Sequence, residues 1–325
     1  MLNLKLHMRE AWVRIKQLKY WSDCMKAYKY LLKLKSDNNR AIFVTSYAIG
    51  DLVYAMSYIK AWKDQNPEYQ VVVIADPKKK DIVESYTGYD EVVYMDRKSI
   101  EGYRVLVRLN GSRYYSFKGR EENIFNLIPI QVYGYKTGKD CLTLLRNYLR
   151  LKDDSDIYYP KPNMDFKIKA IEHFESIKDR VVIVNPYSSG KLNSDCKEVL
   201  ERLVQKLQSK NYIVYTNVIG RQQPLANTKP LNCSLLELYK ISNEIPMVVS
   251  ERSGIMDWII SSKSKKVVLY PDMGNNLLDN KSFKDMFCML KWKTGNCREF
   301  FLYERDAESI CKEVIEYLEE KENEC

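Results

Sequence analysis

The feature that most constrains the fold of this chain is a repeated alternation of short apolar runs with segments of helix length. Valine-rich runs stand at 70–75 (QVVVIA), 180–185 (RVVIVN) and 265–270 (KKVVLY). Runs that are apolar at nearly every position are typical of parallel strands buried on both faces. The sequence therefore predicts an α/β fold, in which helices cover both faces of parallel sheets.

The predicted elements fall into two halves of similar composition. In the first half, strands are predicted at 41–46, 70–75, 91–95 and 103–109, and helices at 50–65, 77–86, 121–135 and 140–151. In the second half, strands are predicted at 180–185, 212–218, 247–249 and 265–270, and helices at 165–177, 195–208, 234–242 and 306–322. A length of 325 residues suits two domains.

A polar segment with Pro160 and Pro162 separates the halves and reads as a linker. The predicted organisation is an N-terminal helix at 1–36, a Rossmann-like domain at 37–155, a linker at 156–165, a second Rossmann-like domain at 166–304 and a C-terminal helix at 305–325. In this architecture the parallel sheets face each other across a cleft, and ligands bind at the carboxyl ends of the strands.

The N-terminal segment holds most of the excess positive charge. Residues 1–36 carry nine basic and two acidic side chains, which is +7 of the net +9. They contain neither Pro nor Gly, and apolar residues recur at helical spacing, so an amphipathic helix is predicted. Two interpretations stay open: the helix lies on an anionic membrane surface, or it packs on the neighbouring domain.

The remaining composition narrows the class of protein. Outside residues 1–36 the chain is nearly neutral and has no nucleic-acid-binding motif, which argues against a nucleic-acid partner. No apolar run approaches the 18 residues of a membrane span, and the eight cysteines lack CxxC spacing. We therefore expect a cytoplasmic protein with reduced thiols, which could be peripheral on the inner face of the membrane.

Two of the loops at strand ends are suited to an anion. The loop 185–193 (NPYSSGKLN) is rich in hydroxyls and has Lys191 to neutralise a phosphate, but Asn185 stands where a Walker A motif needs glycine. The stretch SERSG follows the strand at 247–249 and opens a helix, where Ser253 can cap the helix and Gly254 allows a ligand to approach the backbone. A third loop, 46–56, places Asp51 at the start of a helix.

These three loops, in this order, resemble the heptosyltransferase-like family of GT-B glycosyltransferases. That family has a Gly-Asp turn after its first strand, matched here by Gly50 and Asp51. Its signature reads approximately VSNDSGPMHLAAALGKPVVALFG, and residues 249–271 (VSERSGIMDWIISSKSKKVVLYP) are similar to it. The resemblance spans about residues 40–272.

The chain departs from this family pattern at four positions. Arg252 replaces an acid, Ile255 replaces proline, Asp257 replaces histidine, and Met56 or Ser57 stands near another proline. We therefore expect a different donor sugar. An arginine at position 252 either contacts a diphosphate or forms a salt bridge with Glu251 or a surface acid.

The resemblance implies an inverting glycosyltransferase that moves a sugar from a nucleotide-sugar donor, bound by the second domain, to a glycan or lipid-linked acceptor, bound by the first. Asp51 would be the general base, or alternatively only the N-cap of its helix. Donor-binding candidates are Asn185, Ser188, Ser189, Gly190, Lys191, Arg252, Ser253, Gly254, Met256 and Asp257. Gly50 is an acceptor-binding candidate, and so are three residues near the end of the strand predicted at 103–109, which either contact the acceptor or are simply solvated: Arg108, Asn110 and Arg113.

The implied chemistry uses fixed hydrogen-bond donors for the leaving diphosphate, so we expect neither a metal ion nor another cofactor. The product would be a cell-surface polysaccharide or glycoconjugate. Two alternatives stay open: an epimerase or hydrolase that acts on a nucleotide sugar, and a non-catalytic protein that binds sugar nucleotides or serves in assembly.

Overall fold

The computed structural model describes residues 22, 25–26, 29–30, 33–34, 39–45, 48–100, 124–127, 139–188, 191–272 and 280–320. The chain divides into two compact units. The first holds Met1–Lys161 with Gly274–Phe287, and the second holds Pro162–Met273 with Cys288–Cys325. The first boundary falls inside the predicted linker, whereas Gly274–Phe287 groups with the first unit and not with the domain predicted at 166–304.

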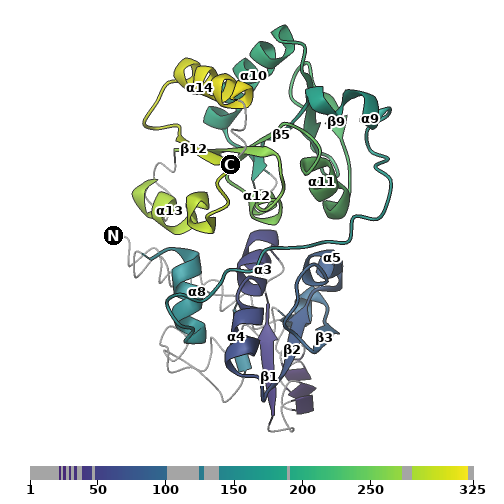
Figure 1. The fold of residues 1–325 in the computed structure, drawn as a ribbon, viewed down its shortest axis with the longest axis vertical. Helices are drawn as coiled ribbons and strands as arrows, with labels where there is room; N and C mark the ends of the chain where they lie inside the picture. Colours follow the sequence, from purple (N-terminus) through teal and green to yellow (C-terminus); the bar gives the residue numbers. More distant parts are fainter. Residues whose placement is uncertain are drawn as a thin grey trace. The chain divides into compact units, whose positions relative to one another are not determined.

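The first unit is built on a sheet of four parallel strands in the order β3-β2-β1-β4. Its elements, drawn in Figure 1, are β1 (Arg40–Val44), α3 (Ile49–Met56), α4 (Ile59–Gln65), β2 (Gln70–Ala75), η1 (Pro77–Lys79), α5 (Lys80–Val83), β3 (Glu91–Tyr94), β4 (Ile124–Asn126), α8 (Cys141–Leu149) and α13 (Asn280–Phe287). The sheet confirms the parallel arrangement predicted from the apolar runs.

One local prediction for this unit is correct only in part, and another is wrong. The helix predicted at 50–65 is interrupted at Ser57, whose backbone carbonyl accepts a hydrogen bond from the Tyr158 N–H. The segment predicted as helix at 121–135 contains the strand β4 instead. The pairing of β4 with β1 is a tertiary contact that overrides the local preference of the segment.

Aromatic packing shows why β4 lies beside β1. Phe125 on β4 stacks on Phe43 of β1 with ring centroids 4.6 Å apart, and Trp62 of α4 meets both rings edge-on at 5.2 Å. Each such aromatic pair contributes about 0.5–1.5 kcal/mol of stability beyond the contribution of the area that the rings bury. Leu34 packs against the hydrophobic cluster of this sheet, so the described end of the N-terminal segment contacts the first unit.

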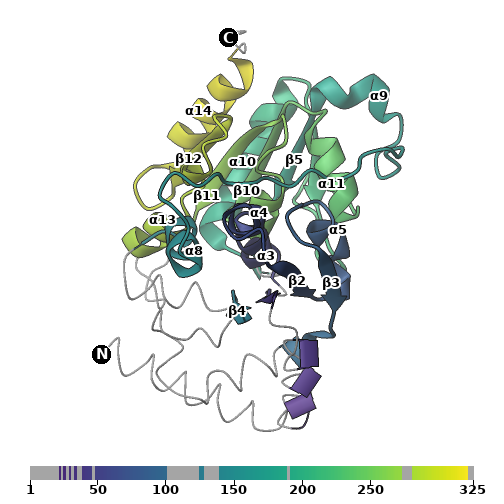
Figure 2. The same cartoon turned by 60° about the horizontal axis from the view of Figure 1, so that its bottom comes forward.

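The second unit is built on six parallel strands in the order β12-β11-β10-β5-β8-β9, and Figure 2 shows β10 between β11 and β5. Its elements are α9 (Phe174–Ile177), η3 (Lys178–Arg180), β5 (Val181–Asn185), β6 (Tyr187–Ser188), β7 (Lys191–Leu192), α10 (Ser194–Ser209), β8 (Ile213–Asn217), β9 (Lys229–Leu231), α11 (Leu235–Ser242), β10 (Met247–Glu251), α12 (Gly254–Trp258), β11 (Lys265–Tyr270), η4 (Met289–Trp292), β12 (Cys297–Phe301) and α14 (Ala307–Glu319). The Rossmann-like prediction is confirmed for this unit as well.

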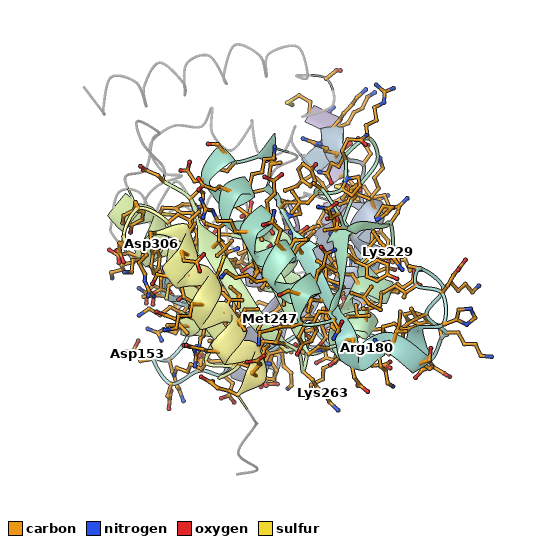
Figure 3. All side chains as sticks on the ribbon, turned by 90° about the horizontal axis from the view of Figure 1, so that it is seen from above. Asp153, Arg180, Lys229, Met247, Lys263 and Asp306 are labelled. Atoms are coloured by element: carbon orange, nitrogen blue, oxygen red, sulfur yellow. The ribbon has the colours of Figure 1, made fainter. Side chains whose placement is uncertain are left out.

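The helices α10 and α14 lie side by side on one face of the second sheet (Figures 1 and 3). Met247 and Val249 of β10 belong to the core cluster that these helices cover. Because successive strand residues point to opposite faces, Ser250 points away from α10 and Glu251 points towards it. Asp306, labelled in Figure 3, caps α14 by accepting from the Ser309 N–H at 2.9 Å.

The carboxylate of Glu299 bonds to residues on both sides of Gly274–Phe287, the segment that groups with the first unit. Glu299 on β12 accepts hydrogen bonds from the hydroxyl of Tyr270, where the chain leaves the sheet. It also accepts from the Met289 N–H at 2.7 Å and the Cys288 thiol at 3.1 Å, where the chain returns. The departure and the return of the chain are therefore held together at β12.

Several sequence predictions lie outside the described residues. These are most of the helix at 1–36, the strand at 103–109, and the acceptor candidates Arg108, Asn110 and Arg113. In the part of the chain that is described, no helix is both long and apolar enough to cross a membrane.

Candidate functional site

The second sheet reverses its strand order between β5 and β10. From β5 the chain proceeds to β8 and β9 on one side, and from β10 it proceeds to β11 and β12 on the other. In open parallel sheets, ligands bind at such a switch point, beyond the carboxyl ends of the two central strands. The loops that follow β5 and β10 are the two that the sequence singled out in this half.

A buried hydrogen-bond network joins the ends of three strands at this switch point. The Asn185 side chain at the end of β5 donates to the Ser250 hydroxyl at 2.9 Å and to the Ser253 hydroxyl at 3.1 Å. Its own oxygen accepts from the side-chain amide of Asn217 on β8 at 3.0 Å. Asn185 is 2% exposed. The Asn185 side chain therefore links the loop after β5 to the turn after β10, and its polar atoms are all bonded within the protein.

The loop after β5 forms a hairpin over the turn after β10. Strands β6 and β7 pair in antiparallel fashion. The Ser188 hydroxyl donates to the backbone carbonyl of Arg252 at 3.1 Å. Ser189 and Gly190 lie outside the described residues, and of Lys191 only the backbone is described. The hairpin thus brings the hydroxyl-rich loop and the Ser-Gly turn into direct contact.

Arg252 forms a buried ion pair with Asp257. Two guanidinium nitrogens donate to the two carboxylate oxygens at 2.8 and 3.0 Å, and the side chains are 5% and 2% exposed. A further bond of 2.8 Å runs from the guanidinium to the carbonyl of Ser253. Arg252 thus forms a salt bridge, as one of its two interpretations expected, but with Asp257, a buried acid that this interpretation did not name. Two of the four positions that depart from the resembled pattern therefore pair with each other.

The Ser-Gly turn has the predicted local geometry in part. Ser253 is the N-cap residue of α12, but its hydroxyl bonds to Asn185 and Ser250 and not to a backbone N–H of the helix. Gly254 begins α12, which is only five residues long. Met256 is fully buried beneath the turn. The predicted donor-binding roles of these residues stay predictions.

Glu251 is a functional candidate that the sequence did not single out. It is 6% exposed, and among the described residues no donor reaches its Oε2 atom. Its carboxylate accepts hydrogen bonds from the Asn193 backbone and the Cys196 thiol, at the start of α10. Burial raises the pKa of Glu251 to about 7. A buried acid with an unpaired oxygen is typical of functional sites.

Asp51 lies at the corresponding switch point of the first sheet, between β1 and β4. Strand β1 leads through residues 45–48 into α3, whose N-cap is Ala48. Gly50 and Asp51 are the second and third residues of the helix, and both are half-buried. The interpretation of Asp51 as the N-cap is therefore wrong. A carboxylate in the first turn still gains from the helix dipole, so a catalytic role is compatible with this position.

The described residues contain no group of three or more His, Cys, Asp or Glu side chains that could together hold a metal ion. The described polar groups at the switch point of the second sheet are hydroxyls, amides, carboxylates and the guanidinium of Arg252. Such groups can bind hydroxyl-bearing and phosphorylated ligands by hydrogen bonds.

The fold is that of GT-B glycosyltransferases, with two Rossmann-like units. A family 9 glycosyltransferase structure from Veillonella parvula is similar with a TM-score of 0.61 and 13% identity, covering 86% of this chain and 97% of that one. The E. coli ADP-heptose lipopolysaccharide heptosyltransferase II is similar with a TM-score of 0.56 and 14% identity, covering 86% and 98%.

A third solved structure, the E. coli heptosyltransferase WaaC with ADP, is similar with a TM-score of 0.51 and 11% identity, covering 86% and 99%. No protein-family model matches the chain, and no curated protein matches it. The family resemblance seen in the loop motifs is thus confirmed at the level of the fold.

Two residues of the second switch point escaped the sequence analysis for physical reasons. Asn217 ends the strand β8 in a segment without a motif, and its contact with Asn185 spans 32 positions. Glu251 stands inside the SERSG stretch, but its burial depends on α10, which is distant in the sequence. The signal that could have found Glu251 is an acidic residue at the end of an otherwise apolar strand.

Proposed function

We propose that the protein is an inverting glycosyltransferase that moves a sugar from a nucleotide-sugar donor to a glycan or lipid-linked acceptor. The observation that carries this proposal is the joined pair of loops after β5 and β10, at the switch point of a sheet in a glycosyltransferase fold. The second unit would bind the donor diphosphate, and the first unit would bind the acceptor.

The donor site would consist of the hairpin 187–192 and the Ser253–Gly254 turn. Hydroxyls and backbone N–H groups of these loops would hold the diphosphate, and Lys191 would neutralise part of its charge. The buried network around Asn185 and the Arg252–Asp257 pair would keep the loops in place before the donor arrives. Because such fixed donors replace a Lewis acid, the proposed reaction needs no metal ion or other cofactor.

The proposed mechanism is a single displacement. Asp51 would take the proton from an acceptor hydroxyl, whose oxygen attacks the anomeric carbon as the nucleoside diphosphate leaves. The attack on the face opposite to the leaving group inverts the configuration. Asp51 is suited to this part because it is half-buried in the first turn of α3 and does not serve as the N-cap.

A thermal-shift screen of nucleotides and nucleotide sugars tests the donor proposal. A ligand at 100 times its Kd adds about 2.7 kcal/mol to the stability of the state that binds it. We expect one base to raise the Tm more than the others, with the diphosphate required. A screen in which no nucleotide or nucleotide sugar shifts the Tm would contradict the proposal.

Asp51→Asn separates catalysis from binding once the donor is known. We expect the donor-induced Tm shift to persist while turnover with a panel of glycan and lipid-linked acceptors falls by about 10²–10⁴-fold. The matched control is Asp81→Asn, an exposed acid on α5 of the same unit. Unchanged turnover in Asp51→Asn would remove the base assignment, and donor binding without turnover in the unaltered chain would favour the binding-only alternative.

We further propose that the basic segment 1–36 holds the enzyme on the inner face of the cytoplasmic membrane, where a lipid-linked acceptor would be found. Each Lys or Arg near an anionic surface contributes about 1 kcal/mol. Co-sedimentation with phosphatidylserine vesicles should be strong for the intact chain, weaker in high salt, and lost for residues 37–325. Equal binding of both chains would contradict this part, and the contact of Leu34 with the first unit would then describe the role of the helix.

A further inference from the structure

The carboxyl group of Glu251 lies between the two loops of the proposed donor site. Ser188, on one strand of the hairpin, bonds to the carbonyl of Arg252, and Asn193, just after its other strand, bonds to the Glu251 carboxylate. These two contacts are thus made to consecutive residues at the end of β10. Glu251 is more than nine-tenths buried, and its Oε2 atom is enclosed without a partner among the described residues.

Among the described side chains, none that faces Glu251 carries a positive charge. From α10 it faces the Cys196 thiol, with the acidic side chain of Asp195 close to that thiol. Across β11 its neighbour in register is Leu269, which is apolar. Arg252, the next residue, has its charge engaged by Asp257. A carboxylate in this position is costly as an anion, because a buried charge without a partner loses its hydration.

An anion bound to the flanking loops would make the charged form of Glu251 costlier still. A diphosphate carries at least two negative charges, and charges of the same sign a few ångströms apart in a site of low dielectric repel strongly. An enclosed oxygen leaves no room for a ligand atom, but a proton can occupy it. Protonation removes the repulsion at this position without any movement of the chain.

We propose that Glu251 takes up one proton from solvent when the diphosphate of the donor binds to the loops on either side of it. The inference rests on the proposed function, because it needs a diphosphate at this site. The step is a simple equilibrium in which a carboxylate and a solvent proton give a neutral carboxylic acid. As a consequence of this protonation, donor affinity depends on pH. Glu251 causes this dependence through its charge and without touching the donor.

The direction of the pH effect follows from where Glu251 titrates. Burial raises its pKa to about 7 in the free protein, and a bound diphosphate raises it further. Below pH 6 both states are protonated and no proton is taken up. Above pH 7 only the free protein loses the proton, so the affinity of the unaltered chain falls as pH rises, by up to about tenfold per pH unit.

Calorimetric titration with a nucleoside diphosphate tests the proposal. The probe is whichever of ADP, UDP, GDP and CDP raises the Tm most, titrated in two buffers of different ionisation enthalpy at pH 6 and pH 8. We expect an uptake approaching one proton at pH 8 in the unaltered chain and none in Glu251→Gln, which mimics the protonated acid. The control Glu201→Gln, on the same helix as Cys196, should behave as the unaltered chain.

Comparison of the two chains cancels the titration of the nucleotide itself, because both bind the same probe. Nucleotide binding with no proton uptake at pH 8, or with an uptake that persists in Glu251→Gln, overturns the inference and leaves the proposed function standing. Binding of none of the four nucleotides overturns both. If Glu251→Gln does not fold, nucleotide binding by the unaltered chain without proton uptake at pH 8 still overturns the inference.

Discussion

The Arg252–Asp257 pair offers the sharpest test of how the candidate site is held together. Both side chains are almost completely buried, and their two hydrogen bonds are 2.8 and 3.0 Å long. Asp257→Asn removes the negative charge to which two nitrogens of the buried guanidinium donate. Breaking such a pair costs about 3–5 kcal/mol, and for a unit of this size each kcal/mol lowers the Tm by about 2–4 °C.

The expected result for Asp257→Asn is therefore a fall of the Tm by about 6–20 °C, with the free energy of unfolding measured by urea denaturation. The matched control is Glu198→Gln, which breaks the exposed pair of Glu198 with Arg202 on α10. That pair is about half exposed on both sides, so its loss should cost at most about 0.5 kcal/mol.

A double-mutant cycle decides whether the energy belongs to the pair. Arg252→Asp with Asp257→His restores the acid and the histidine that the resembled family has at these positions, so the two charges can pair with reversed polarity at low pH. We expect the double variant to lose less stability than the two single variants summed, by at least about 1 kcal/mol. A cost below about 1 kcal/mol for Asp257→Asn, or strictly additive costs, would refute the argument.

Two further predictions concern stability outside the site. Lys266 is fully buried, its amine donates to two backbone carbonyls, and burial lowers its pKa from 10.5 to about 7. As pH falls from 10.5 to 7, the unfolded chain binds a proton at Lys266 that the folded chain does not, so the free energy of unfolding decreases. The stability gained by Lys266→Met should therefore be about 3 kcal/mol larger at pH 7 than at pH 9.5, as measured by urea denaturation. A gain independent of pH would contradict this. Gly88 has φ +94°, and a Cβ there would lie 2.3 Å from the Lys60 Cα. Gly88→Ala should therefore lower the free energy of unfolding by at least about 2 kcal/mol, and a neutral result would show that the backbone relaxes.

The parallel sheets could be predicted from the sequence because their strands are buried on both faces. β2 and β5 are apolar at nearly every position, and their predicted and observed bounds agree within one residue. β4 could not be predicted, because only three residues pair and the stack of Phe125 on Phe43 involves a partner more than 80 residues away. Local propensity holds no information about such a contact.

The loops of the candidate site could be located from their residue types, but the use of each side chain could not. Arg252 and Asp257 are five positions apart, which is not the spacing of neighbours on a helix, and they pair only because the turn at Ser253 bends the chain between them. Asn185 reads as a ligand contact in a polar loop, whereas burial makes it the centre of a network. Whether such a side chain contacts a ligand or supports the fold depends on its exposure, which cannot be read directly from a single sequence.

The division of the chain into units has a consequence for cleavage, because neither unit is a single continuous stretch of sequence. Residues Gly274–Phe287 group with the first unit, although they lie between two parts of the second unit in the sequence. Tyr270, before this segment, and Cys288 and Met289, after it, all donate hydrogen bonds to Glu299. A protease that cuts once near Lys161 therefore does not produce two self-sufficient pieces. The N-terminal piece lacks α13, and the C-terminal piece carries α13 without the unit to which it belongs. We therefore expect residues 1–161 or 162–325 expressed alone to be less stable than the same unit in the whole chain, because each piece differs from its unit by Gly274–Phe287.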